Sequence, residues 1–164
     1  MAEFKHISGL KELSAKLKAM PEDLRKKTLK PAVGSGAKIV RDEARILAPK
    51  YEGITARGHA PAGTLKKSII LKWIREESSD SNQVFYVTVK RGVKFMKVKR
   101  RKKGVVTLEN QDAYYWFMVE FGTSKMSAQA FMVPAFEHKK GAALDVIIAK
   151  LREGINKTTG FALQ

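Results

Sequence analysis

The side chains that could carry acid–base or metal chemistry are few and scattered along the sequence. The histidines are His6, His59 and His138, and none has a second histidine at ligand spacing. Asp42 and Glu43 are adjacent in a helical pattern, so their carboxylates point about 100° apart instead of converging on one substrate. No phosphate-binding Gly-rich loop, nucleophile elbow or zinc signature is present. We therefore assign no catalytic residue, metal or cofactor.

The charge balance is the most unusual property of the composition. Among 164 residues, 32 are Lys or Arg and 16 are Asp or Glu, which gives a formal net charge of +16. Such an excess creates a positive field that favours polyanions: DNA, RNA, an acidic protein surface or an anionic membrane. The alternative is an ordinary Lys-rich solvated surface, but much of the excess is concentrated in one short segment.

That basic segment extends from residue 90 to residue 103 and contains no acidic residue. Its nine cations are Lys90, Arg91, Lys94, Lys97, Lys99, Arg100, Arg101, Lys102 and Lys103. Like charges repel, so we expect an extended arm that meets something anionic. The apolar residues between the cations suit a β-arm, which could follow phosphates without reading base sequence. The arm could instead dock on an acidic neighbouring subunit, or be a solvated loop without a partner.

Other features of the composition are consistent with a soluble protein. The chain has no Cys, which suits a reducing cytoplasm. The N-terminal residues have no signal-peptide pattern, and no apolar stretch approaches the roughly 18 residues of a membrane-spanning helix. We expect one domain over residues 1–164, with no membrane partner.

Helical patterns occupy the two ends of the chain. Residues 8–19 form a short amphipathic pattern with Ser8 as N-cap, and Pro21 opens a longer helix that Pro49 stops. Pro31 and the Gly34–Gly36 run predict a kink or break in its middle. Pro134 opens a C-terminal helix, whose buried stripe is predicted to be Leu144, Ile147, Ile148, Leu151 and Ile155.

Strand patterns lie between these helices. The alternation from Leu65 to Ile74 predicts a first strand and residues 84–90 a second, with a polar turn at 76–82. Residues 93–98 and 105–108 resemble the two sides of a hairpin with a basic tip. Residues 114–121 fit either a strand or a short helix. We predict an α+β fold: an antiparallel sheet with the long N-terminal helix and the C-terminal helix packed on it, plus a basic β-hairpin arm at about residues 90–110.

Four short motifs follow one another through this framework. They are Ala48-Pro49 at a helix end, a segment with Gly63, Leu65 and Ser68, the run Glu120-Phe121-Gly122-Thr123, and Phe131 followed by Pro134. In order and spacing, over residues 8–157, they resemble the family of small neck and tail-component proteins of long-tailed phages and prophages. The chain departs from the family pattern at Ser127 and Ala130, where Pro is common, and at Ala62, where Thr is common.

The resemblance implies a structural protein of the virion, made in the host cytoplasm and placed at the head–tail junction. It implies a homo-oligomeric ring, a hexamer, that completes or terminates the tail, binds the connector and tail-tube proteins, and passes DNA through its lumen. Two other functions stay open: a stand-alone DNA-binding protein that uses the basic hairpin, and a phage enzyme such as a nuclease with an unrecognised site.

The third motif has a physical interpretation of its own. Gly122 predicts a positive φ or a close backbone approach after Phe121. We interpret Glu120 as a hydrogen-bonded anchor of the loop rather than as a catalytic acid. Met126, Phe131 and Met132 would pack under the loop or face a neighbouring subunit.

Overall fold

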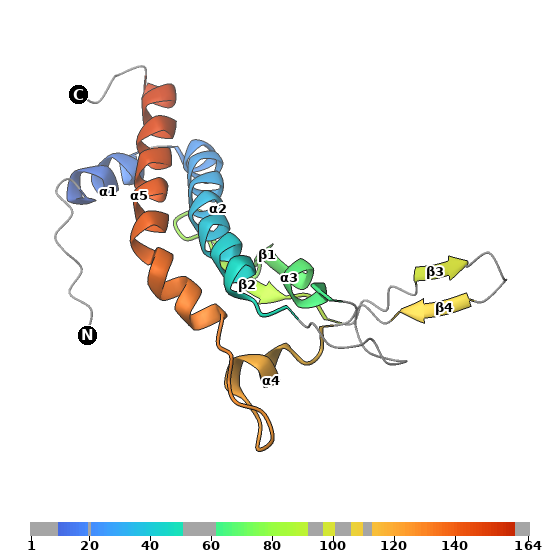
Figure 1. Ribbon diagram of the computed structural model, residues 1–164. Helices are drawn as coiled ribbons and strands as arrows, with labels where there is room; N and C mark the ends of the chain where they lie inside the picture. The colour runs from blue at the N-terminus through green and yellow to red at the C-terminus, as the bar shows by residue number, and fades with distance from the viewer. Residues whose placement is uncertain are drawn as a thin grey trace.

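The structure is a computed structural model, and it describes residues 10–19, 21–50, 62–91, 97–100, 106–109 and 113–159. Its elements are α1 (Leu10–Ala19), α2 (Glu22–Leu47), α3 (Thr64–Ser68), β1 (Ile69–Trp73), β2 (Phe85–Val89), β3 (Lys97–Arg100), β4 (Val106–Glu109), α4 (Trp116–Phe121) and α5 (Met132–Thr159) (Figure 1). This mixture of helices and antiparallel pairs confirms the predicted α+β fold.

The two longest helices, α2 and α5, pack side by side and form the main layer of the molecule (Figure 1). Glycine lets their backbones come close. A Cβ built on Gly36 would lie 2.5 Å from Cγ1 of Ile147, and one on Gly154 would overlap the side chain of Thr28. The Gly34–Gly36 run is therefore a packing feature of α2, which the sequence pattern alone did not reveal.

The predicted break near Pro31 is not found, because α2 continues from Glu22 to Leu47 as one helix. The hydroxyl of Ser35 donates a hydrogen bond to the Pro31 carbonyl oxygen across 2.8 Å, within the same stretch of helix. Packing against α5 on both sides of this position offsets the missing backbone hydrogen bond, as tertiary contacts often override local propensity.

A two-stranded antiparallel sheet lies against α2. Ile69 of β1 pairs with Val89 of β2, and the register continues to Trp73 opposite Phe85. The guanidinium of Arg45 on α2 donates two hydrogen bonds to the Ile69 carbonyl oxygen, at 3.0 and 2.7 Å. This contact ties the start of β1 to the end of the helix.

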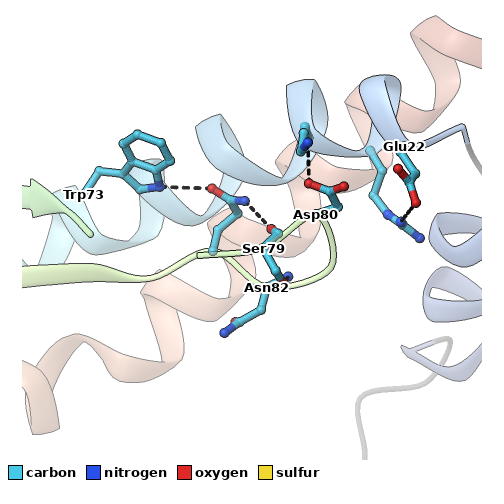
Figure 2. Close-up of polar contacts among 8 residues, drawn as sticks. Glu22, Trp73, Ser79, Asp80 and Asn82 are labelled. Carbon is cyan, nitrogen blue, oxygen red and sulfur yellow. Dashed lines mark hydrogen bonds and ion pairs between the residues drawn. The ribbon is translucent and has the colours of Figure 1, made fainter. Parts of the chain in front are cut away.

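The polar turn that joins β1 to β2 is also held to α2 (Figure 2). Lys26 forms an ion pair of 2.5 Å with Asp80, and the Trp73 indole N–H donates to Gln83 Oε1 at 3.1 Å. The ammonium of Lys30 lies 3.3 Å from the centre of the Trp73 ring, a cation–π contact. Both ends of the sheet are therefore fixed to the same helix.

The first strand begins later than the sequence predicts. Residues 64–68 form the short helix α3, and β1 starts at Ile69. Gly63 precedes α3 with φ 79°, and its carbonyl accepts the Lys67 amide at 3.1 Å. Leu65 is 2% exposed, so the apolar residue that suggested a strand is buried by a helical turn instead.

Two apolar clusters make up the core of the part of the chain that the structure describes. The first, where α2, α3, β1, β2 and the start of α5 meet, comprises Ala44, Ala48, Leu65, Ile69, Val89, Ala113, Phe131 and Ala135. The second lies between α1, α2 and α5 and comprises Leu13, Leu29, Ala32, Ile148, Leu151 and Ile155. Leu144 and Ile147 pack against the second cluster, so the predicted stripe of α5 is confirmed.

The remaining expectations concern the short elements. α1 confirms the predicted N-terminal helix, while Ser8 lies outside the described residues. β3 and β4 pair as a hairpin that extends away from the helices (Figure 1), in agreement with the predicted arms where they overlap. Residues 93–96 and 105 of those arms lie outside the described residues. Of the two options for residues 114–121, the structure has the helix, α4.

Candidate partner-binding surfaces

Glu120 is the best-defined polar side chain of the third motif. It lies on α4, is 4% exposed, and accepts three hydrogen bonds from the first turn of α5. Oε2 accepts the amides of Phe131 at 2.8 Å and Met132 at 3.0 Å, and Oε1 accepts that of Val133 at 3.1 Å. A carboxylate at this place also complements the positive end of the helix dipole. With these donors, Glu120 has the anchoring role that the sequence analysis favoured over acid catalysis.

Pro134 completes the same cap. The first amides of a helix have no partner within it, and Glu120 accepts three of them. The next residue is Pro134, which has no amide hydrogen to satisfy. The amide of Ala135 then donates to the Phe131 carbonyl at 3.2 Å and begins the regular helical pattern. Motifs separated in the sequence thus build one helix start.

The loop between α4 and α5 depends on Gly122. This residue has φ 76° and ψ −179°, a conformation that is essentially restricted to glycine. A Cβ here would lie 2.9 Å from the Ala128 amide nitrogen. Thr123 and Met126 exchange backbone hydrogen bonds of 2.8 and 3.2 Å, which closes a tight turn that projects from the body (Figure 1).

Three of the four motifs contribute residues to the first apolar cluster, and the third is joined to it by the hydrogen bond from the Phe131 amide to Glu120. Ala48 precedes Pro49 at the end of α2, Leu65 comes from α3, and Phe131 is fully buried beside them. Tyr115, just before α4, packs against this cluster, and its burial raises the pKa of its hydroxyl. The motif residues therefore fix the position of α4 and of the projecting turn relative to the sheet.

Around this anchored region several large apolar side chains are exposed. Phe117 and Phe121 are 40% and 73% exposed and lie one helical turn apart on α4. Val133 and Phe136, at 61% and 54%, lie in the first turns of α5. We call these four residues the apolar face. Of these four residues only Phe121 belongs to one of the sequence motifs. The exposure of Phe117, Val133 and Phe136 could not be predicted from the sequence, because their spacing also fits a buried stripe.

An apolar groove of about 680 Å³ adjoins the apolar face and shares Phe136 with it. It runs between α2, β2 and α5, and its walls include Val40, Phe85, Val87 and Leu144. Its charged lining residues are Glu137 and Lys140, which pair with each other at 2.5 Å. This lining suits an apolar side chain of a partner better than a polar substrate.

The basic residues divide between the body and the hairpin. Lys90 and Arg91 follow β2 directly and are exposed, while Lys97, Lys99 and Arg100 lie on β3. In the β3–β4 register, Lys97 is opposite Glu109 and Arg100 is opposite Val106. The other predicted cations of the segment, Lys94, Arg101, Lys102 and Lys103, lie outside the described residues.

Of the candidate acid–base residues, the structure describes Asp42, Glu43 and His138, while His6 and His59 lie outside the described residues. Asp42 accepts two hydrogen bonds from its neighbour Arg41, at 2.9 and 2.6 Å. Glu43 points instead towards α5, where it lies 3.6 Å from both His138 Nδ1 and Lys139 Nζ. Within the described residues no three His, Cys, Asp or Glu side chains gather as metal ligands. None of the helices in that part of the chain is long and apolar enough to cross a membrane.

Comparison with known proteins relates the chain to a protein family. Residues 11–122 match the family described as "Bacteriophage HK97-gp10, putative tail-component". The matched stretch extends from α1 to Gly122, so it takes in the helix α2, the sheet, the hairpin and Glu120 but not α5. Searches of curated proteins and of solved structures found no match. Because the family match covers more than half of the sequence and agrees with the motifs, the chain belongs to the HK97-gp10-like family of phage tail components.

Proposed function

We propose that this protein is a structural subunit at the phage head–tail junction, where identical copies close into a six-membered ring that completes the tail. The observation that carries the proposal is the family match over residues 11–122. In this role the protein works by binding alone: it contacts the connector on one side and the tail tube on the other, while DNA passes through the lumen.

The apolar face supports self-association. Exposed apolar clusters on soluble proteins commonly mark interaction sites. Phe121 and Val133 project from elements that the Glu120 cap holds rigidly together, so a neighbouring subunit would meet a preformed surface. Contact between this face and a different surface of the next copy, such as the apolar groove, is a heterologous contact. Repeated heterologous contacts generate a closed ring when the rotation that relates one subunit to the next divides a full turn evenly.

Disabling the gene in the phage that encodes the protein tests the proposed role. We expect filled heads and separate tails to accumulate, and supply of the intact gene from a plasmid to restore joined particles. Electron microscopy of the lysate counts the joined fraction. A normal yield of joined particles without the gene would show that the proposal is wrong.

A surface variant tests self-association more closely. Phe121→Ser is expected to reduce complementation and to shift the assembled species towards monomer, as measured by native mass spectrometry. Tyr86→Ser is the matched control, because Tyr86 is 46% exposed and lies on β2, outside the apolar face. Equal behaviour of both variants would exclude the apolar face as the subunit contact.

The basic hairpin favours one alternative, a stand-alone DNA-binding protein. It rests on Lys97, Lys99 and Arg100 occupying one strand of a hairpin that extends from the body. That function predicts strong, salt-sensitive DNA binding by a monomer or dimer and no defect in particle joining when the gene is disabled.

A further inference from the structure

The sheet brings together cations that are more than twenty residues apart in the sequence. Lys66 and Lys67 lie on α3 just before β1, while Lys90 and Arg91 come directly after β2. The Lys90 amide donates to the Ser68 carbonyl at 2.8 Å, extending the antiparallel pairing beyond Ile69 and Val89. The two pairs of cations therefore stand side by side at one end of the sheet.

All four side chains are exposed at this end. Lys66, Lys67 and Arg91 form no ion pair with any residue that the structure describes. The helix α3, which contains Lys66 and Lys67, lies on the side of the body from which β3 and β4 extend (Figure 1). The four cations are called the basic platform below.

Acidic residues of the sheet region lie at its opposite end. Glu76, Glu77 and Asp80 are all in the turn between β1 and β2, which is separated from the basic platform by about 15 Å of strand. Two of these acids are also engaged, Glu77 with the Tyr86 hydroxyl and Asp80 with Lys26. Within the described residues, the positive charges of Lys66, Lys67 and Arg91 are thus not neutralised by ion pairs with the acids of this turn.

We propose that Lys66, Lys67, Lys90 and Arg91 bind the sugar–phosphate backbone of duplex DNA and continue the basic surface of the hairpin onto the body. The inference rests on the proposed function, in which DNA passes through a ring, and it adds Lys66 and Lys67, which lie outside the basic segment of the sequence. Contacts of this kind position the protein on DNA without reading base sequence.

The composition of the surface favours phosphate over a protein partner. Protein–protein interfaces are depleted in Lys and enriched in aromatic residues and Met. Three of the four platform residues are Lys. No large exposed apolar residue of the described structure lies on α3 or at residues 90–91; such residues lie on α2, β2, α4, α5 and the turns on either side of α4. Long lysine side chains carrying mobile point charges suit a regular array of phosphates.

Salt-dependent binding of the full-length protein to a short duplex of arbitrary sequence tests the inference. One variant replaces Lys66 and Lys67 with Gln, and a second also replaces Lys90 and Arg91. Each neutralised phosphate contributes about 0.9 to the slope of log K against log salt, so the slope should fall by about 2 in the first variant and by about 4 in the second. Thermal melting checks that both variants are folded.

A matched control removes the same charge elsewhere. It replaces with Gln four exposed lysines that form no ion pair with a described residue: Lys18, Lys27, Lys38 and Lys125. Its slope is expected to stay close to that of the unmodified protein. If the slope of log K against log salt fell equally in the control, only the net charge of the protein would matter. If the slope were unchanged in both platform variants, the platform would not contact DNA. Either result overturns the inference.

The same variants separate this inference from the proposed function. If the gene-disabled phage still produces joined particles, the proposed function is wrong whatever the slopes are. If the gene is needed for joining and the platform variants bind DNA unchanged but no longer join tails, the platform binds a protein and the inference alone fails.

Discussion

The amide of Phe131 donates to Glu120 Oε2 across 2.8 Å, and this buried hydrogen bond joins α4 to the start of α5. Met132 and Val133 donate to the same carboxylate, so one side chain fixes a whole helix start. The apolar face is built from these two helices, and its shape therefore depends on a residue that is itself buried.

Replacement of Glu120 should destabilise the protein in proportion to the number of acceptors removed. We expect Glu120→Ala to lower the free energy of unfolding by about 2–4 kcal/mol, because the amides of Phe131, Met132 and Val133 lose their acceptor. Glu120→Gln should lower it by about 1–2 kcal/mol, because one carbonyl oxygen remains. Urea unfolding measures both. Glu137→Ala, at an exposed position, should change stability by less than about 0.5 kcal/mol. A Glu120→Ala protein as stable as that control would contradict the capping role.

Among the described residues, Gly63 and Gly122 have positive φ, and their conformations predict different tolerance to substitution. Gly63 has φ 79° and ψ 6°, which Asn also adopts, and no atom lies within 4 Å of its built Cβ. Gly122 has ψ −179° and crowded surroundings. Gly122→Asn and Gly122→Val should each cost at least about 2 kcal/mol, against less than about 1 kcal/mol for Gly63→Asn, as measured by thermal melting. Similar costs at both positions would show that the backbone at Gly122 is not restrictive.

Two glycines within helices should respond to alanine with opposite signs. Gly141→Ala is expected to stabilise by about 0.5–1 kcal/mol, since Ala favours the helix and nothing lies within 4 Å of the new methyl group. Gly36→Ala is expected to destabilise by about 1–3 kcal/mol, because the methyl group would meet Ile147 and force α2 and α5 apart. Chemical denaturation of the two variants in parallel gives the comparison. A gain in stability at both positions would disprove close packing at Gly36.

Neutralising the hairpin should affect binding and leave stability nearly unchanged. The variant replaces with Gln the six clustered cations Lys97, Lys99, Arg100, Arg101, Lys102 and Lys103. We expect these charges to face solvent or a partner. Such charges contribute little to stability, so the melting temperature should be almost the same. The slope of log K against log salt should fall by about 0.9 for each phosphate that the arm no longer neutralises. Unchanged DNA binding together with failure to join tails would identify the arm as a protein-docking element.

Local patterns in the sequence predicted most of the framework. The stripe of α5, the second strand and the polar turn follow from periodicity alone, because each element buries one face. The predicted start of the first strand at Leu65 was wrong. Thr64 and Leu65 are buried by the helical turn α3, and burial of an apolar residue does not by itself distinguish a helical turn from a strand. The predicted break at Pro31 was wrong. Contacts with α5, which lies more than a hundred residues later in the sequence, keep α2 continuous at this position.

The surfaces were less predictable than the framework. The basic segment is contiguous in the sequence and was evident, but Lys66 and Lys67 join it only through the pairing of β1 with β2. Phe117, Val133 and Phe136 sit in patterns that resemble a core, and only packing shows that they face outwards. Glu120 was singled out as an anchor, whereas its three donors could be identified only once α4 and α5 were placed.

The pairing of α2 with α5 also has a consequence for how the protein is made. The partner of α2 is α5, which is synthesised later, and at 5–20 residues per second the roughly 80 residues between them take about 4–17 s to translate. During that interval Leu29 and Ala32 have no cover from Ile148 or Leu151. Nascent chains that stall before α5 would therefore expose half of a core cluster to one another. The yield of folded subunits should then depend on chaperones that hold α2 until α5 has been made.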